Sequence, residues 1–78
     1  MNHEIKIRFR IVKNRHVIEV LFDERLSFHE NFRILNEICN ENLADVRVYD
    51  PMKRIFLDRD VPLSTFSFQY FVSFYLFN

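Results

Sequence analysis

Apolar and basic residues alternate through residues 4–13 of the chain. The apolar set is Ile5, Ile7, Phe9 and Ile11, and the basic set is Lys6, Arg8 and Arg10. A period of two with one apolar face predicts a half-buried strand. Residues 16–23 are rich in β-branched side chains and predict a second strand, paired with the first as a hairpin. In the polar break between them, Asn14 is the residue best able to take a positive φ.

Helical spacing replaces this alternation from Ser27 to Asn40. The apolar stripe consists of Phe28, Phe32, Leu35 and Ile38 or Cys39. Ser27 is a good N-cap, and Glu30, three residues later, completes a capping box. The helix is expected to end near Asn40 and Asn42, either of which suits a left-handed cap. One amphipathic helix between two sets of strands must bury its stripe on a sheet, which predicts an α+β two-layer fold.

The second half of the chain again has the pattern of strands. Residues 46–49 predict a strand with Val46 and Val48 pointing inward, and residues 50–53 predict a turn in which Asp50 takes the first position. A short strand over 54–58, a charged loop over 58–60 and a short turn or 3₁₀ segment over 62–66 follow. Residues 70–77 are apolar on both faces, which is typical of a central strand or of a strand whose outer face is covered by something else. The order is ββαββ-turn-β in one domain, residues 1–78, with the first and last strands parallel at the centre of a mixed sheet.

Composition suggests that part of the apolar surface is exposed. Hydrophobic residues make up 49% of the 78 positions and ten of them are Phe, more than one thin core can hide. Large exposed apolar patches usually mark a partner surface. Eleven basic and eleven acidic residues balance, which argues against nucleic acid as a partner. The absence of glycine excludes a Gly-rich phosphate loop.

No pattern of residues predicts catalysis, a cofactor or a metal. The histidines at positions 3, 16 and 29 have no ligand spacing and are expected at the surface. Asp58 and Asp60 flank an arginine and predict a solvated turn rather than a carboxylate pair, and Ser64 lies in no nucleophile motif. Cys39, the one cysteine, excludes an internal disulfide and is expected to act as a small core residue. We therefore expect a protein that is not an enzyme.

Targeting and membrane signals are also missing from the pattern. Met1 leads directly into the first strand without a signal peptide. No apolar run approaches the ~18 residues that a membrane-spanning helix needs. The expectation is a cytoplasmic protein that does not insert into membranes.

The outer face of the predicted sheet is the candidate binding surface. In the last strand Val72, Phe74 and Leu76 are expected to face the helix. The residues expected on the outer face are Lys6, Arg8, Arg10, Arg47, Tyr49, Phe71, Ser73, Tyr75 and Phe77. Arginine mixed with aromatics is favoured in protein interfaces and their hot spots. Two alternatives stay open: the residues cover each other, with arginine stems over aromatic rings, or a one-residue slip exchanges the two faces.

The order of elements, together with the stretch L-S-T-F-S-F-Q at 63–69 before the last strand and the V-R-V-Y strand at 46–49, resembles the β-grasp fold of ubiquitin. Small stand-alone bacterial ubiquitin-like proteins of the YukD and EsaB type, which accompany type VII secretion systems, are similar in length and lack a tail. The resemblance implies a non-enzymatic accessory or regulatory role through protein contacts, with the outer sheet face as docking patch. The sequence ends at Phe77-Asn78 without Gly-Gly, so conjugation is not expected.

Two classes of function follow from this face. The first is a protein-interaction module that binds another protein or a second copy of itself. The second is a small nucleic-acid-binding module, because basic and aromatic residues interleave as they do on sheet platforms that stack bases. The balanced charge makes nucleic acid the weaker hypothesis.

Overall fold

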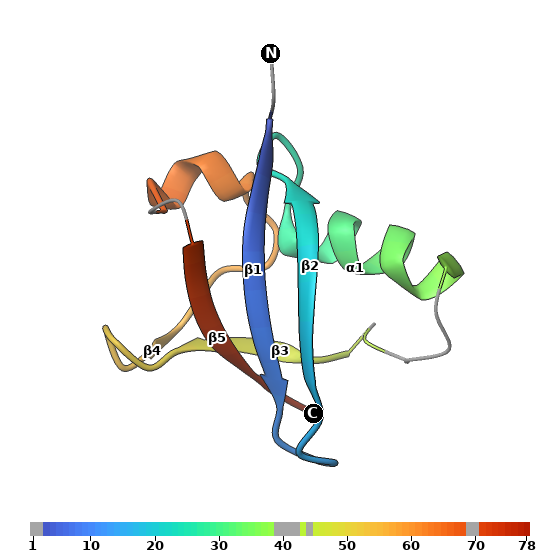
Figure 1. Cartoon of the computed structure of the whole chain (residues 1–78). Helices are drawn as coiled ribbons and strands as arrows, with labels where there is room; N and C mark the ends of the chain where they lie inside the picture. The colour runs from blue at the N-terminus through green and yellow to red at the C-terminus, as the bar shows by residue number, and fades with distance from the viewer. Residues whose placement is uncertain (1–2, 39–42, 44, 69–70) are drawn as a thin grey trace.

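The computed structural model describes residues 3–38, 43, 45–68 and 71–78. The elements are β1 (Glu4–Ile11), β2 (Val17–Asp23), α1 (Phe28–Ile38), β3 (Arg47–Asp50), β4 (Ile55–Phe56), the 3₁₀ helix η1 (Leu63–Phe66) and β5 (Phe71–Phe77). The strands form one sheet in the order β2-β1-β5-β3-β4 (Figure 1). This is the mixed sheet with one main helix that the sequence predicts. The predicted fourth strand, residues 54–58, is reduced to two residues.

The two central strands run parallel, as predicted. β1 pairs with β5 in parallel, and with β2 as an antiparallel hairpin. The inward residues of β1 are all buried, so its alternation correctly predicts the core face. β5 has Phe74 and Leu76 buried and its alternate residues exposed or half-buried. The slipped register, which would exchange the two faces, is therefore excluded.

The helix begins where the capping box places it. The Ser27 hydroxyl accepts a hydrogen bond from the Glu30 N–H at 3.1 Å and donates to the Glu30 carboxylate at 3.2 Å. Phe28 and Phe32 are fully buried and Leu35 is half-buried. Ile38, by contrast, is 79% exposed, so of the two residues predicted for this place on the stripe, Ile38 or Cys39, Ile38 is wrong and Cys39 lies outside the described residues. At 100° per residue, Ile38 lies about 80° around the helix from the direction of Phe28, and this turns it away from the sheet.

Several predictions at the helix end and before the last strand fall on residues outside the described ones. They concern the core role of Cys39, the caps at Asn40 and Asn42, and the start of the last strand at Tyr70.

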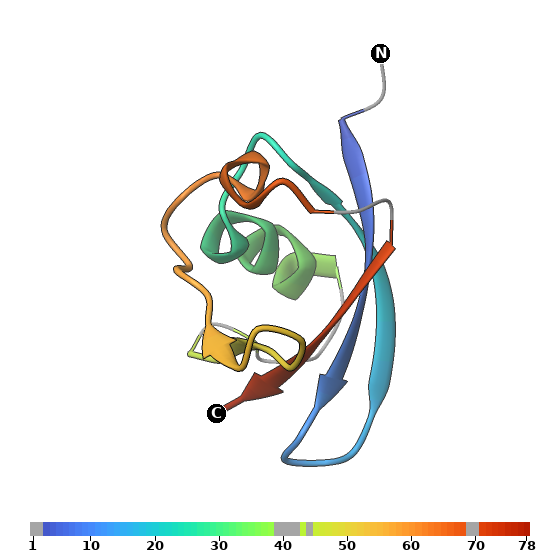
Figure 2. The ribbon, with the colours of Figure 1, turned by 90° about the vertical axis from the view of Figure 1, so that its left-hand side faces the viewer.

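The helix lies over one face of the sheet (Figure 2), and phenylalanine side chains fill the space between the two layers. Phe9, at the centre of β1, has its ring 5.5 Å from Phe22, 5.4 Å from Phe32 and 6.3 Å from Phe28 and Phe74, measured between ring centroids. Such tilted and edge-to-face pairs add to the free energy gained from apolar burial. Seven of the ten phenylalanines lie in this core or at its margin: Phe9, Phe22, Phe28, Phe32, Phe66, Phe68 and Phe74. The other three lie on the opposite face of the sheet, as the composition suggests.

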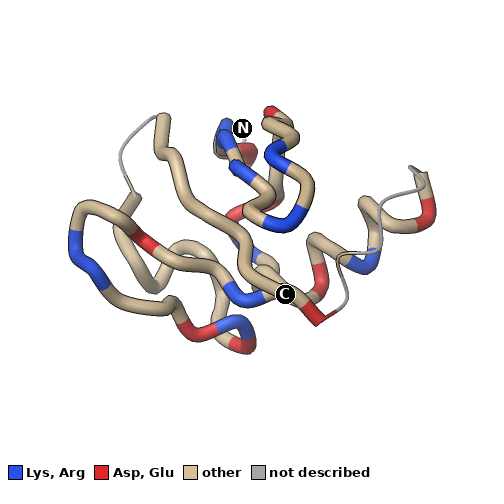
Figure 3. Tube along the Cα trace, turned by 90° about the horizontal axis from the view of Figure 1, so that it is seen from below, with Lys and Arg blue, Asp and Glu red and all other residues tan. Residues whose placement is uncertain are grey.

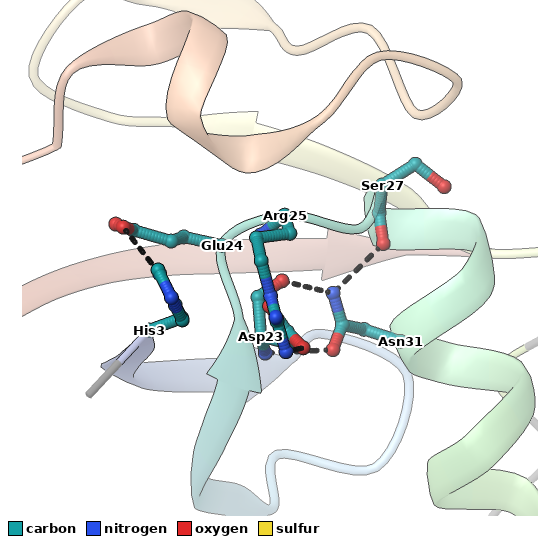
Figure 4. A network of polar contacts seen from close by, with 6 residues as sticks. All are labelled: His3, Asp23, Glu24, Arg25, Ser27 and Asn31. Atoms are coloured by element: carbon teal, nitrogen blue, oxygen red, sulfur yellow. Dashed lines mark hydrogen bonds and ion pairs between the residues drawn. The ribbon is translucent and has the colours of Figure 1, made fainter. Parts of the chain in front are cut away.

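Asn31 is a buried polar residue on the inner side of the helix, and the hydrophobic pattern does not predict it. Its side-chain NH₂ donates to the carbonyl oxygens of Asp23 (3.0 Å) and Ser27 (2.9 Å), and its Oδ1 accepts from the Asp23 N–H (3.0 Å). Figure 4 shows this amide between the end of β2 and the start of α1. The side chain therefore fixes the angle at which the helix leaves the sheet.

Turns form without glycine at a cost in backbone strain. Arg15, Arg54 and Ser67 take positive φ values of 63°, 60° and 53°. The prediction that Asn14 takes the positive φ of the hairpin is wrong. Asn14 instead accepts a hydrogen bond from the His16 N–H through its Oδ1, and this side-chain turn moves the left-handed residue one position along.

Candidate functional site

Alternate residues of all five strands project from the sheet face opposite the helix. The register places Lys6 beside Phe71, Arg8 beside Ser73 and Arg10 beside Tyr75. On the other side of β5, Arg47 pairs with Phe77 and Tyr49 with Tyr75. The structure thus brings all nine predicted residues together on one face, which we call the outer face. It carries a basic row along β1 and an aromatic group across β5, β3 and β4.

Four rings form the aromatic group. Tyr49 lies at its centre, with its ring centroid 5.1 Å from Phe56, 5.9 Å from Phe77 and 6.5 Å from Tyr75. Phe56 and Phe77 close the set at 5.8 Å. The two tyrosine rings are nearly parallel, at 15°, and the other pairs meet edge to face. These contacts hold the four rings in fixed orientations before any partner arrives.

Cations lie against two of the outer rings. The Arg47 guanidinium is 4.5 Å from the Phe56 centroid. The Arg8 guanidinium and the Lys6 Nζ lie 5.3 Å and 6.0 Å from the Phe71 centroid. Cation–π attraction therefore orients part of the basic row along the sheet. The alternative that these residues cover each other is correct for these contacts.

Glu19 on β2 neutralises one cation of the row. Its Oε1 accepts a hydrogen bond from Arg8 at 2.9 Å, directly across the β1–β2 ladder. That hydrogen bond lowers the pKa of Glu19, so the pair stays ionised well below neutral pH. Glu19 therefore offsets the positive charge of Arg8 within the row.

Mutual covering leaves much of the aromatic surface accessible. Phe56 is 47% exposed, Phe71 39% and Tyr75 37%. Each ring therefore still offers apolar area that would be removed from water on binding. Contiguous exposed apolar area of this kind is typical of interaction sites.

Some outer-face residues were missed from the sequence, among them Phe56 on β4 and the exposed residues Val17, Glu19 and Leu21 on β2. Phe56 comes from a strand of only two residues, too short for alternation to assign it a face. Leu21 is exposed on β2 beside Lys6. Its alternation with Glu19 and Val17 is the signal that could have found it.

Side chains that could act as catalytic groups or metal ligands make local contacts with neighbouring polar groups. The Asp58 carboxylate accepts the Asp60 N–H at 2.9 Å, as expected of a turn. His29 Nδ1 lies 3.1 Å from Arg59 Nη2, and His3 Nδ1 lies 3.9 Å from Glu24. Among the residues that the structure describes, no three His, Cys, Asp or Glu side chains are grouped to hold a metal.

Charge is spread over the molecule. Lys and Arg positions and Asp and Glu positions occur around the whole trace in Figure 3. The basic row on β1 is thus a feature of one face rather than of the whole protein.

In the described part of the chain, no helix is long and apolar enough to cross a membrane.

No protein-family model and no curated protein matches the sequence. Solved structures do match in shape. One is the crystal structure of the UBL domain of Plasmodium falciparum Dsk2, with a TM-score of 0.72 over 94% of this chain and 95% of that chain, at 14% identity. Another is the solution NMR structure of the ubiquitin-like domain of Arabidopsis thaliana protein At2g32350, with a TM-score of 0.72 over 97% of this chain and 78% of that chain, also at 14% identity. The element order, the parallel β1–β5 centre and these similarities show that the chain has the ubiquitin-like β-grasp fold.

Proposed function

We propose that residues 1–78 act as one non-enzymatic protein-interaction module, which binds another protein or a second copy of itself through the outer face. The observation that carries this proposal is the aromatic group: prearranged rings of Tyr49, Phe56, Tyr75 and Phe77 stand next to a basic row on the face that the helix leaves uncovered. Rigid aromatics and arginine are the residues that dominate binding energy at interfaces. The fold supports the proposal, because ubiquitin-like domains generally mediate protein interactions.

Self-association is the first arm to test. Solution mass by light scattering is measured for the wild type, for Tyr75→Ala and for Ile38→Ala. Ile38 is a matched control, because it is an exposed apolar residue on the helix side of the molecule. A dimer that Tyr75→Ala dissociates and Ile38→Ala preserves supports the outer face as a self-interface.

Binding to a different protein is the second arm. If all three proteins are monomers, each is used to capture partners from native cells. We expect Tyr75→Ala and Tyr49→Ala to weaken capture at least tenfold, as hot-spot truncations do, and Ile38→Ala to leave it unchanged. A partner retained at full strength by both tyrosine variants would overturn the proposal.

The more specific role that we propose is a cytoplasmic accessory or regulatory component of a type VII secretion system. Its support is the sequence resemblance to bacterial proteins of the YukD and EsaB type. The test is co-purification of the tagged chain with the components of such a system expressed in the same cells. Capture only of proteins unrelated to secretion would reject this role and leave the interaction module standing.

A nucleic-acid-binding module is the alternative, favoured by the row Lys6, Arg8 and Arg10 beside the exposed Tyr75 and Phe71. Against it stand the balanced charge and the Arg8–Glu19 ion pair. A fluorescence titration with labelled single-stranded RNA decides between them. Binding at low salt that falls steeply as salt rises would support the alternative, and no binding at low salt would remove it.

A further inference from the structure

A pocket lies beside the outer face, and its described lining consists of residues 50–53 in the turn that follows β3, residues 66–68 at the end of η1 and residues 71–74 of β5. Figure 1 shows where these elements lie in the fold. The volume of the pocket is about 560 Å³, within the range of sites that bind ligands or deeply inserted side chains. The apolar side chains of its lining are Met52, Phe66, Phe68, Phe71, Val72 and Phe74. Such a lining favours a large apolar group.

The carboxylate in the lining is already used. Asp50 is only 6% exposed, and its Oδ1 accepts the N–H groups of Met52 at 2.9 Å and Lys53 at 3.4 Å. These hydrogen bonds form the turn after β3, as the sequence predicts. The two backbone N–H groups thus offset part of the negative charge of Asp50.

One cation belongs to the described lining of the pocket, and two more lie against the ring of one lining residue. Lys53 lines the pocket from the turn and is exposed. Phe71 also lines the pocket and has Lys6 and Arg8 against its ring. Glu19 neutralises Arg8, which leaves Lys6 and Lys53 as the cations that set the local potential. An apolar pocket with a basic rim is complementary to an apolar group that has negative charge next to it.

We propose that this pocket receives a large apolar side chain from an acidic peptide segment of the partner protein. The inference rests on the proposed function, since the pocket shares Phe71 and Ser73 with the outer face and extends that face. It adds the chemistry of the partner: a leucine or phenylalanine inserts among the pocket phenylalanines, and flanking aspartates or glutamates lie near Lys6 and Lys53.

The experiment uses two fluorescein-labelled peptides and the full chain. One peptide has Leu-Phe at its centre and two aspartates on each side. The matched peptide has asparagine at the four aspartate positions. We expect fluorescence anisotropy to show at least tenfold tighter binding of the acidic peptide at low salt, with most of the difference lost at high salt. Equal binding of the two peptides, or no binding of the acidic one, would overturn the proposal.

Variants locate the binding site. Lys53→Glu is expected to weaken the acidic peptide about threefold to tenfold, because it reverses one rim charge. Lys13→Glu is the matched control: it makes the same change in net charge at an exposed position of the β1–β2 hairpin, and it is expected to have no effect. Met52→Ala, at a residue 89% exposed, is expected to weaken both peptides without affecting the fold. Equal effects of Lys53→Glu and Lys13→Glu would reject the pocket.

Tyr75→Ala separates this inference from the proposed function. Tyr75 belongs to the outer face but does not line the pocket, so peptide binding is expected to survive its removal. If Tyr75→Ala abolishes peptide binding and Lys53→Glu does not, the acidic segment lies on the aromatic group. That result would overturn the proposal that the pocket binds the acidic segment, and it would leave the proposed interaction module standing. A dimer that Lys53→Glu dissociates would assign the pocket to a second copy and overturn the acidic-peptide partner.

Discussion

Removing the Asn31 side chain tests whether one buried amide sets the position of the helix. The side chain makes three hydrogen bonds, two to backbone carbonyls and one from the Asp23 N–H. At about 1 kcal/mol each, they contribute roughly 3 kcal/mol. Alanine recovers about 0.7 kcal/mol through its higher helix propensity. Asp23 and Ser27 also keep a second partner each for their carbonyl oxygens, the N–H groups of Leu26 and Asn31. We therefore expect Asn31→Ala to lower the free energy of unfolding by about 2 kcal/mol.

Urea denaturation followed by far-ultraviolet circular dichroism measures this loss, since the chain has no tryptophan. Arg33→Ala, on the exposed side of the same helix, is the control and is expected to change stability by less than about 0.5 kcal/mol. A loss of less than about 0.5 kcal/mol for Asn31→Ala would refute the reasoning. It would mean that water replaces the amide at no cost.

Asn31→Asp sharpens the test through pH. The new carboxyl group keeps an acceptor for the Asp23 N–H but would point a charged oxygen at two carbonyl oxygens, so burial and repulsion raise its folded-state pKa above the ordinary value. A group with a raised folded pKa stabilises most below its unfolded pKa, near 3.9, and loses that contribution as pH rises. The variant should therefore approach wild-type stability near pH 4 and be least stable, relative to wild type, at pH 7. A difference from wild type that does not change with pH would contradict this account.

Three further predictions concern the core, a charge pair and a turn. Phe9→Leu should cost about 1–2 kcal/mol in urea denaturation and Phe56→Leu less than about 0.5 kcal/mol, because only the first opens a void in the core; equal losses would contradict the core assignment. Hydrogen bonds from the side chain and the N–H of Arg25 lower the pKa of Asp23 to about 2, so the stability from this group is full above about pH 4 and is lost as pH falls toward 2. Asp23→Asn should therefore flatten the pH dependence of the urea midpoint between about pH 2 and pH 4, and an unchanged dependence would reject this role of Asp23. Arg15→Asn should raise stability by up to about 1 kcal/mol, since Asn tolerates positive φ better, and a decrease would show that Arg15 makes other contacts.

Local pattern was sufficient for most of the architecture. Alternation in residues 4–11 determined which side chains of β1 enter the core, because a strand exposes successive residues to opposite faces. The Ser27–Glu30 pair determined where the helix begins, because its cap is made within one turn. The central place predicted for the last strand followed from the apolar pattern of residues 71–77, and β5 does lie between β1 and β3, although Phe71 and Tyr75 on its outer face stay partly exposed.

Local pattern failed where a residue's environment comes from distant segments. Asn31 looks like a polar residue of an amphipathic helix, and only the approach of the β2 end provides the partners that let it be buried. Ile38 is apolar but 79% exposed, because its position around the helix turns it away from the core. Phe56 is placed on the outer face only because β4 pairs with β3, which sets it opposite Tyr49.

The candidate sites divide in the same way. The sequence by itself determined which nine residues share the outer face, because a period of two assigns each side chain in a strand to a face. Tertiary structure alone decided that Arg8 is paired with Glu19, that four rings from three strands touch, and that residues 50–53, 66–68 and 71–74 line one pocket. Those features depend on distances between segments far apart in the chain, and such distances are set by how the strands pair and the core packs, which no local pattern encodes.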